Sequence, residues 1–131
     1  MTVFDWKKPT VQMLGRWQPW HDGHQALFKR CVAKTGQVII QVRDVQGASG
    51  GDGQDDNPFD WKTVCLNIEK SLLADGFTRG TEYEIMLVPN IVNITYGRGV
   101  GYSFGEEVFD DSVTKISATN IRQKLRDEGN L

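Results

Sequence analysis

Apolar and polar residues follow two different periods in the first third of the chain. Residues 11–15 (VQMLG) form a short apolar run, and residues 37–43 (QVIIQVR) form a second run that is rich in β-branched side chains, as strands are. Between them, residues 25–35 carry apolar side chains at helical spacing and stop at Gly36, a residue typical of helix ends. Because parallel strands are joined through a right-handed crossover, we expect a βαβ unit with the two strands paired.

The alternation of strand-like and helix-like segments continues to the end of the chain. Asn57-Pro58 indicates the start of a helix that runs to about Asp75. Three further elements are expected, namely a third strand, a short fourth strand and a last helix, over residues 83–89, 90–95 and 119–126. This order predicts an α/β fold, a Rossmann-like open parallel sheet with helices on both faces, in a single domain that spans residues 1–131. Ligands of such folds bind beyond the carboxyl ends of the strands.

The segment 15–24, GRWQPWHDGH, is the strongest candidate for chemistry, because it lies where the first strand gives way to the first helix. Gly15 allows a tight turn there. His21 and His24 then flank the start of the helix, where free backbone N–H groups and the helix dipole favour an anion. The two imidazoles add hydrogen-bonding nitrogens, so this corner predicts a polyphosphate ligand.

Other residues of the same segment have expected structural tasks. Asp22 is placed to cap the helix, with Gln25 three residues later, and Gly23 leaves room at the helix start. Trp17 and Trp20 can either pack beneath the turn or stack on a bound ring, and we favour packing.

Composition and charge narrow the classes of function. The formal net charge of -2 gives no overall attraction to nucleic acid or to an anionic membrane, so phosphate binding has to be local to a site. No apolar run approaches the roughly 18 residues that span a bilayer. Cys31 and Cys65 form no CxxC pair, and the first residues lack the apolar core of a signal peptide. We therefore expect a reduced, cytoplasmic protein with no nucleic-acid or membrane partner.

Residues 44–56 are rich in glycine and aspartate and show no hydrophobic period, which predicts a mobile loop able to close over a substrate. Within this loop, GGDGQDDN lacks the ligand order of a calcium loop, so we expect no metal held by the protein. The chain has no Walker motif, and glycines 97, 99 and 101 do not form a GxGxxG fingerprint. P-loop and dinucleotide-dependent enzymes are therefore not indicated.

Two ordered motifs resemble a known family. GRWQPWHDGH is similar to the HxGH signature of the nucleotidyltransferase superfamily, in the GRFQPxHxGH form of nicotinamide mononucleotide adenylyltransferases and their cytidylyltransferase-like relatives. Residues 116–122, ISATNIR, resemble the ISxTxIR element that opens a late helix in that family. NPF at residues 57–59 and TYGR at residues 95–98 also resemble family stretches. The resemblance therefore spans nearly the whole chain.

The resemblance implies transfer of a nucleoside monophosphate from a nucleoside triphosphate to a small phosphorylated acceptor, with release of pyrophosphate. The GRFQP-like start favours ATP and transfer of AMP, and a CTP-dependent cytidylyltransferase acting on an alcohol phosphate is the alternative. A nucleotide-binding regulatory module without turnover is a further alternative. The resemblance also implies Mg²⁺ bound mainly through the triphosphate, and it is compatible with a homo-oligomer.

Residue roles follow from the resemblance as well. His21 and His24 are expected to contact the triphosphate as catalytic residues, and Arg122 is expected to bind the leaving pyrophosphate through its planar fork. Ser117 and Thr119 are expected to donate hydrogen bonds to the β- and γ-phosphates. A second group is expected to bind nucleotide or phosphate, comprising Gly15, Arg16, Trp17 and Gly23. Two arginines are weaker candidates for the acceptor, Arg43 and Arg98.

Overall fold

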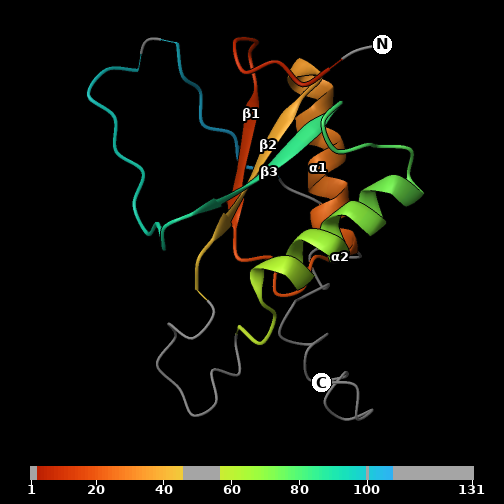
Figure 1. Cartoon of the computed structure of the whole chain (residues 1–131). Coiled ribbons are helices and arrows are strands. Elements are labelled where there is room, and N and C mark those ends of the chain that lie inside the picture. Colours follow the sequence, from red (N-terminus) through yellow and green to blue (C-terminus); the bar gives the residue numbers. More distant parts are fainter. Residues whose placement is uncertain (1–2, 46–56, 100, 108–131) are drawn as a thin grey trace.

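Three parallel strands and two helices make up the regular part of the computed structural model, which describes residues 3–45, 57–99 and 101–107. Their order is β1 (Val11–Gly15), α1 (Asp22–Thr35), β2 (Val38–Arg43), α2 (Trp61–Ala74) and β3 (Tyr83–Val88). β2 lies in the middle of the sheet and pairs in parallel with β1 on one side and β3 on the other (Figure 1). The predicted α/β class with a Rossmann-like parallel sheet is confirmed.

The ends of the two helices test the predicted boundaries. α1 ends as expected, because Gly36 adopts a left-handed φ of 90° and its N–H donates to the carbonyl of Val32. The predicted start of α2 at Asn57-Pro58 is wrong, since the helix begins at Trp61 and Asp60 is its N-cap. The Asp60 carboxylate accepts from the backbone N–H of Thr63 at 2.8 Å, which satisfies one of the free donors of the first turn.

The third strand is confirmed, but the predicted fourth strand over residues 90–95 is not. β3 ends at Val88, and Pro89 follows with no N–H to extend the ladder. Residues 90–95 pair with no strand in the described part of the chain, and the N–H of Ile91 turns back to the carbonyl of Pro89. The last predicted helix, over residues 119–126, lies outside the described residues, as do residues 46–56 of the predicted loop.

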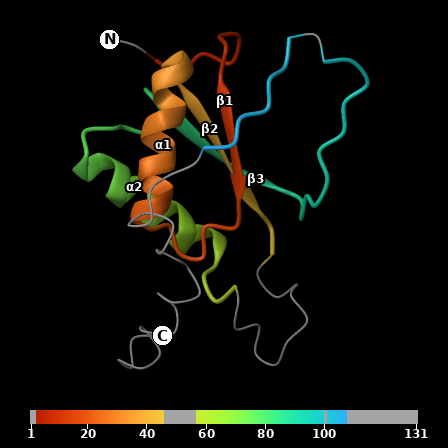
Figure 2. The same ribbon diagram turned by 180° about the vertical axis from the view of Figure 1, so that it is seen from behind.

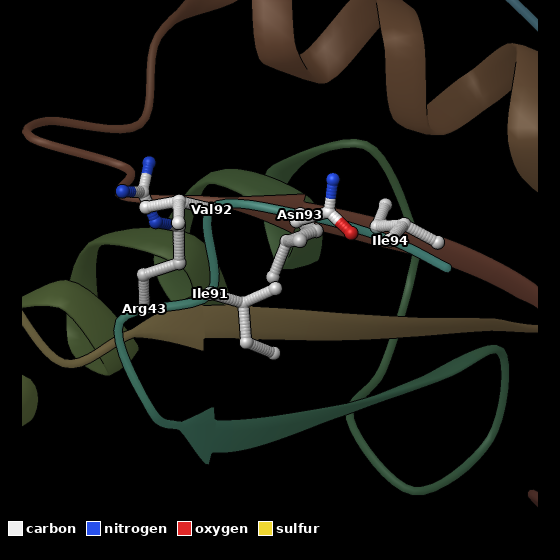
Figure 3. Close-up of a pocket in the computed structure, with 6 residues that line it drawn as sticks. Arg43, Ile91, Val92, Asn93 and Ile94 are labelled. Carbon is white, nitrogen blue, oxygen red and sulfur yellow. The ribbon is translucent and has the colours of Figure 1, made fainter.

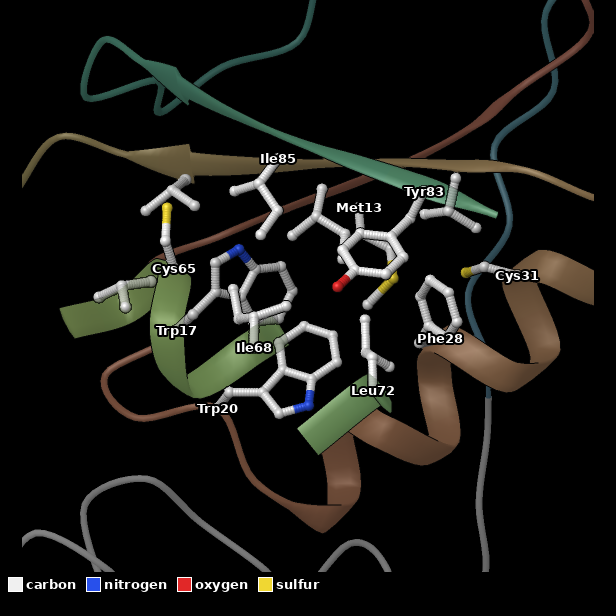
Figure 4. Packing of buried hydrophobic residues seen from close by; sticks show 14 residues of the cluster. Met13, Trp17, Trp20, Phe28, Cys31, Cys65, Ile68, Leu72, Tyr83 and Ile85 are labelled. Carbon is white, nitrogen blue, oxygen red and sulfur yellow. The ribbon is translucent and has the colours of Figure 1, made fainter. Parts of the chain in front are cut away.

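Both described helices cover the same face of the sheet, and the apolar core lies between them and the strands (Figure 4). Right-handed crossovers place successive helices on one face when the sheet grows in one direction, as it does here from β1 to β3. The core cluster comprises Met13, Trp17, Trp20, Phe28, Cys31, Val38, Ile40, Val42, Val64, Cys65, Ile68, Leu72, Tyr83 and Ile85. No helix covers the other face in the described part of the chain. The prediction of helices on both faces is therefore met on one face only in this part.

Residues 89–99 leave the end of β3 and run outside the sheet on the side away from the helices, and residues 101–107 return beside α1 (Figures 1 and 2). The returning end is held by Glu107, which forms ion pairs with Lys34 at 2.7 Å and Arg30 at 3.5 Å. Within the described ranges, no helix is long and apolar enough to cross a membrane.

Candidate functional site

The candidate corner, residues 15–24, lies at the carboxyl edge of the sheet, as predicted. β1 ends at Gly15, which pairs in register with Val42, and β2 ends one residue later at Arg43. Because the strands are parallel, the turn that follows β1 and the side chain at the end of β2 share one edge of the sheet. The topology therefore brings the two histidines and Arg43 to the same side of the molecule.

The backbone of the corner is shaped by Trp17. This residue has a left-handed φ of 54°, which is strained for a bulky side chain, and the peptide bond between Gln18 and Pro19 is cis. The Trp17 ring folds back over Gly15, where an added Cβ atom would lie 2.8 Å from ring atom Cζ2. Its indole N–H donates to the carbonyl of Gln41 in β2 at 3.1 Å. Gly15 is thus required by the close approach of this ring.

The two histidines cap α1 themselves. His21 is the N-cap, and its Nδ1 accepts from the N–H of Gly23 at 3.0 Å, while Nδ1 of His24 accepts from the N–H of His21 at 3.2 Å. The predicted cap by Asp22 with Gln25 is therefore wrong, because Asp22 is already the first residue of the helix. The spacing of His21 and His24 matches that of a capping box, with imidazole nitrogens in place of the usual oxygens.

The capping bonds determine which nitrogen of each imidazole carries the proton. A nitrogen that accepts a hydrogen bond has no proton, so we assign the neutral Nε2–H tautomer to both His21 and His24. Burial lowers the pKa of His21, and burial followed by the proximity of His21 lowers the pKa of His24 to about 3. The rings are stacked, with centroids 3.7 Å apart and planes 20° from parallel. At neutral pH the corner therefore offers two uncharged N–H donors beside the helix N-terminus.

Two tryptophans form the apolar surroundings that keep His24 neutral. The ring of Trp17 meets the imidazole edge-on at 4.7 Å, and the ring of Trp20 lies 5.5 Å from it. Both residues are buried, with 5% and 6% of their surfaces exposed, and Figure 4 shows them side by side in the core near α2. Of the two readings of the sequence, packing beneath the turn is confirmed.

Residues 57–59, which precede α2, form hydrogen bonds with the corner. The side-chain amide of Gln18 donates to the carbonyl of Phe59 and accepts from its N–H, each at 2.9 Å. Arg16 donates to the side-chain oxygen of Asn57 at 3.2 Å. Gln18 and Asn57 are 4% and 2% exposed. Neither contact is predicted from the sequence, although the joint occurrence of GRWQP and NPF in the resemblance is a signal that the two segments meet.

Arg43 lines an open pocket of about 460 Å³ between the end of β2 and the segment that follows β3 (Figure 3). The other lining residues are mostly apolar, namely Leu14, Ile91, Val92, Asn93 and Ile94. One guanidinium nitrogen, Nη2, donates to the side-chain oxygen of Asn90 at 2.7 Å. The buried Nε has no hydrogen-bond partner among the described residues. The pocket thus combines apolar walls with a guanidinium cation, and not all N–H groups of that cation are used in hydrogen bonds within the described residues.

The remaining candidates are placed less closely or lie outside the described part. Arg98 is exposed and does not line this pocket. Ser117, Thr119 and Arg122 lie outside the described residues, so their expected roles stay predictions. Over the described ranges, no three His, Cys, Asp or Glu side chains gather as a metal site would need.

No protein-family model matches the chain. The chain is similar to the nicotinamide-nucleotide adenylyltransferase of Methanococcus aeolicus, with 25% identity over 133 aligned positions that cover 86% of this chain and 75% of that protein. This similarity confirms the resemblance at the level of the nucleotidyltransferase superfamily.

Proposed function

We propose that this relative of the adenylyltransferases transfers AMP from ATP to a small phosphorylated acceptor and releases pyrophosphate. The observation that carries the proposal is the pair of stacked, neutral imidazoles, whose free Nε2–H groups stand beside the N-terminus of α1 at the carboxyl edge of the sheet. The name of the similar protein favours ATP over CTP as the donor.

The proposed reaction needs no nucleophile from the protein. An oxygen of the acceptor phosphate attacks the α-phosphorus of ATP in line, the bond from that phosphorus to the bridging oxygen breaks, and pyrophosphate leaves with the bonding electron pair. Catalysis then depends on positioning and on stabilising the negative charge that grows on the phosphate oxygens. His21 and His24 supply preorganised donors for those oxygens without having to lose or gain a proton.

Mg²⁺ belongs to this proposal as part of the nucleotide substrate. The donor set of the corner consists of imidazole and backbone N–H groups, which bind phosphate oxygens rather than a cation. Magnesium keeps several waters and takes few protein ligands, so it fits a site in which the triphosphate holds it. Ser117, Thr119 and Arg122 are proposed to complete the contacts to the β- and γ-phosphates.

The pocket at Arg43 is proposed to receive the acceptor. Its guanidinium has N–H groups for a phosphate besides the one that bonds Asn90, and the apolar walls suit the face of a ring or a chain. Nicotinamide mononucleotide is the first acceptor to try, because the similar protein is named for it.

Pyrophosphate release tests the proposal directly. The protein is incubated with MgATP or MgCTP and a panel of phosphorylated acceptors, and we expect acceptor-dependent release that is faster with ATP. His24→Ala should lower kcat by about a hundredfold, the scale seen when a preorganised donor to a charged transition state is removed. Nucleotide binding that raises the melting temperature without any pyrophosphate release would instead favour the regulatory module.

A further inference from the structure

Gln25 is a buried polar residue next to His24, and the proposed reaction gives it no role. Its side-chain oxygen accepts from the indole N–H of Trp20 at 2.7 Å, and its side-chain nitrogen donates to the carbonyl of Ser71 and to a carboxylate oxygen of Asp75, each at 2.8 Å. Because an indole N–H can only donate and a carbonyl can only accept, the orientation of the amide is unambiguous. The amide therefore satisfies partners at both of its ends.

These bonds join the start of α1 to the end of α2. Ser71 lies in the last turn of α2, where carbonyls have no partner within the helix, and Asp75 is the C-cap of the same helix. Asp75 also forms an ion pair with Lys29, one turn further along α1, at 2.9 Å. Gln25 is thus held against a rigid element rather than against a loop.

The other end of the amide reaches the aromatic surroundings of His24. The Trp20 ring contacts the His24 imidazole, and it also contacts Trp17 at 5.1 Å. Trp17 is anchored through its own indole N–H to the carbonyl of Gln41 in β2. His24 therefore lies against two indoles, of which one is held by the sheet and the other, through Gln25, by α2.

We propose that Gln25 is a positioning residue, which holds the Trp20 indole and through it keeps the His24 imidazole aimed at the nucleotide. Without the amide, the buried N–H of Trp20 has no partner, and the ring has to shift to find one. A shift of this kind moves a preorganised donor, to which phosphoryl-group transfer is sensitive. The catalytic consequence depends on the proposed function, whereas the orientation of His24 does not.

The test compares two buried glutamines in the full-length chain. Gln25→Met keeps the length of the side chain and removes its hydrogen bonds. Gln37→Met is the matched control, because Gln37 is 4% exposed and its amide bonds both the N–H and the carbonyl of Asp5 at the opposite edge of the sheet. Both substitutions should lower the melting temperature.

Imidazole nitrogen NMR then separates positioning from stability. In the wild-type protein and in Gln37→Met, we expect His24 to remain the Nε2–H tautomer down to about pH 5, because burial lowers its pKa to about 3. In Gln25→Met we expect mixed tautomers and titration at a higher pH. In the transfer assay, kcat of Gln25→Met should fall about tenfold with less than a twofold change in KM for ATP, as expected for a misplaced donor.

The inference is overturned if Gln25→Met loses stability as Gln37→Met does and yet leaves the His24 signals as in the wild type, because Gln25 would then be structural alone. Altered His24 signals in a protein that has no transferase activity even as wild type would refute the proposed function and leave the positioning intact. If Gln25→Met does not fold, Trp20→Phe removes the indole N–H while keeping an aromatic ring, and the same NMR comparison decides.

Discussion

At the scale of single residues, His21 and His24 combine helix capping with ligand binding. Each Nδ1 accepts a backbone N–H at the start of α1, and each Nε2–H remains for a ligand. A serine or aspartate cap would satisfy the same backbone donors but would not offer an N–H to a phosphate. The capping geometry therefore also determines the tautomer that the proposed chemistry needs.

The pH dependence of stability follows from the same geometry. The chain has two histidines, and both lie in the corner. Burial lowers the folded-state pKa of His24 from 6.5 to about 3, so the unfolded chain binds a proton as pH falls through its own pKa while the folded chain does not. The stabilisation is therefore complete above the unfolded pKa and is lost as pH falls toward the folded one, by about 1 kcal/mol for His24 between about pH 7.5 and 5.5.

Urea unfolding at the two pH values measures this loss. His24→Gln is the control, because a glutamine at this helix position can accept from the N–H of the N-cap and does not titrate. We expect the free energy of unfolding of this variant to change less with pH than that of the wild type. An equal loss in both proteins would show that His24 is not held neutral.

Gly15 gives a second prediction at this scale. Gly15→Ala places a Cβ atom against the Trp17 ring, and we expect a loss of about 1–3 kcal/mol in the free energy of unfolding, as for other overpacked sites. Gly97→Ala is the control, because a Cβ there meets nothing within 4 Å. In the double variant Gly15→Ala with Trp17→Phe, the smaller ring should relieve the clash and make the two effects less than additive. Additive effects would contradict the contact.

At the scale of elements, local patterns predicted the three strands and the end of α1, because each signal lies within the element itself. The predicted start of α2 was wrong because Asn57 is a typical helix-capping residue in sequence, but its side-chain oxygen accepts a hydrogen bond from Arg16, 41 residues earlier. The prediction of a fourth strand failed for a related reason, since the apolar residues Ile91, Val92 and Ile94 line a pocket instead of pairing with a strand. Contacts between distant segments are not encoded in local periodicity.

The hydrogen bonds between the corner and the segment that precedes α2 can be tested by replacing Gln18. Gln18→Ala removes both bonds to the Phe59 backbone, and we expect a loss of about 1–3 kcal/mol in the free energy of unfolding because partly buried groups lose their partner. Gln12→Ala is the control, since Gln12 is an exposed glutamine of β1 and its amide bonds the half-buried side chain of Gln41. Similar losses for both variants, measured by urea unfolding, would show that the hydrogen bonds between Gln18 and Phe59 have no specific role in stability.

At the scale of the whole molecule, the resemblance offered Arg43 and Arg98 as weaker candidates for the acceptor, and the parallel topology places Arg43 at the same edge of the sheet as the histidine corner. The resemblance could not rank the two arginines, because Arg43 and Arg98 are both candidates by position in the sequence. The structure separates them, since Arg43 lies in a pocket and Arg98 is exposed. The remaining part of the proposed site, on residues 117–122, stays a prediction.

Because the two arginines lie in different places, the proposal that the acceptor binds at Arg43 and the triphosphate binds at the histidine corner can be tested. Arg43→Met keeps much of the apolar contact and removes the charge and the donors, so we expect KM for the phosphorylated acceptor to rise about tenfold or more, because a charged hydrogen bond is lost. KM for ATP should change little, since the triphosphate is assigned to the corner that follows β1. Arg98→Met should affect the acceptor less than Arg43→Met does. A rise in KM for ATP alone would move Arg43 to the nucleotide side of the site, and a larger effect at Arg98 would mean that the acceptor contacts the outer segment instead of the pocket.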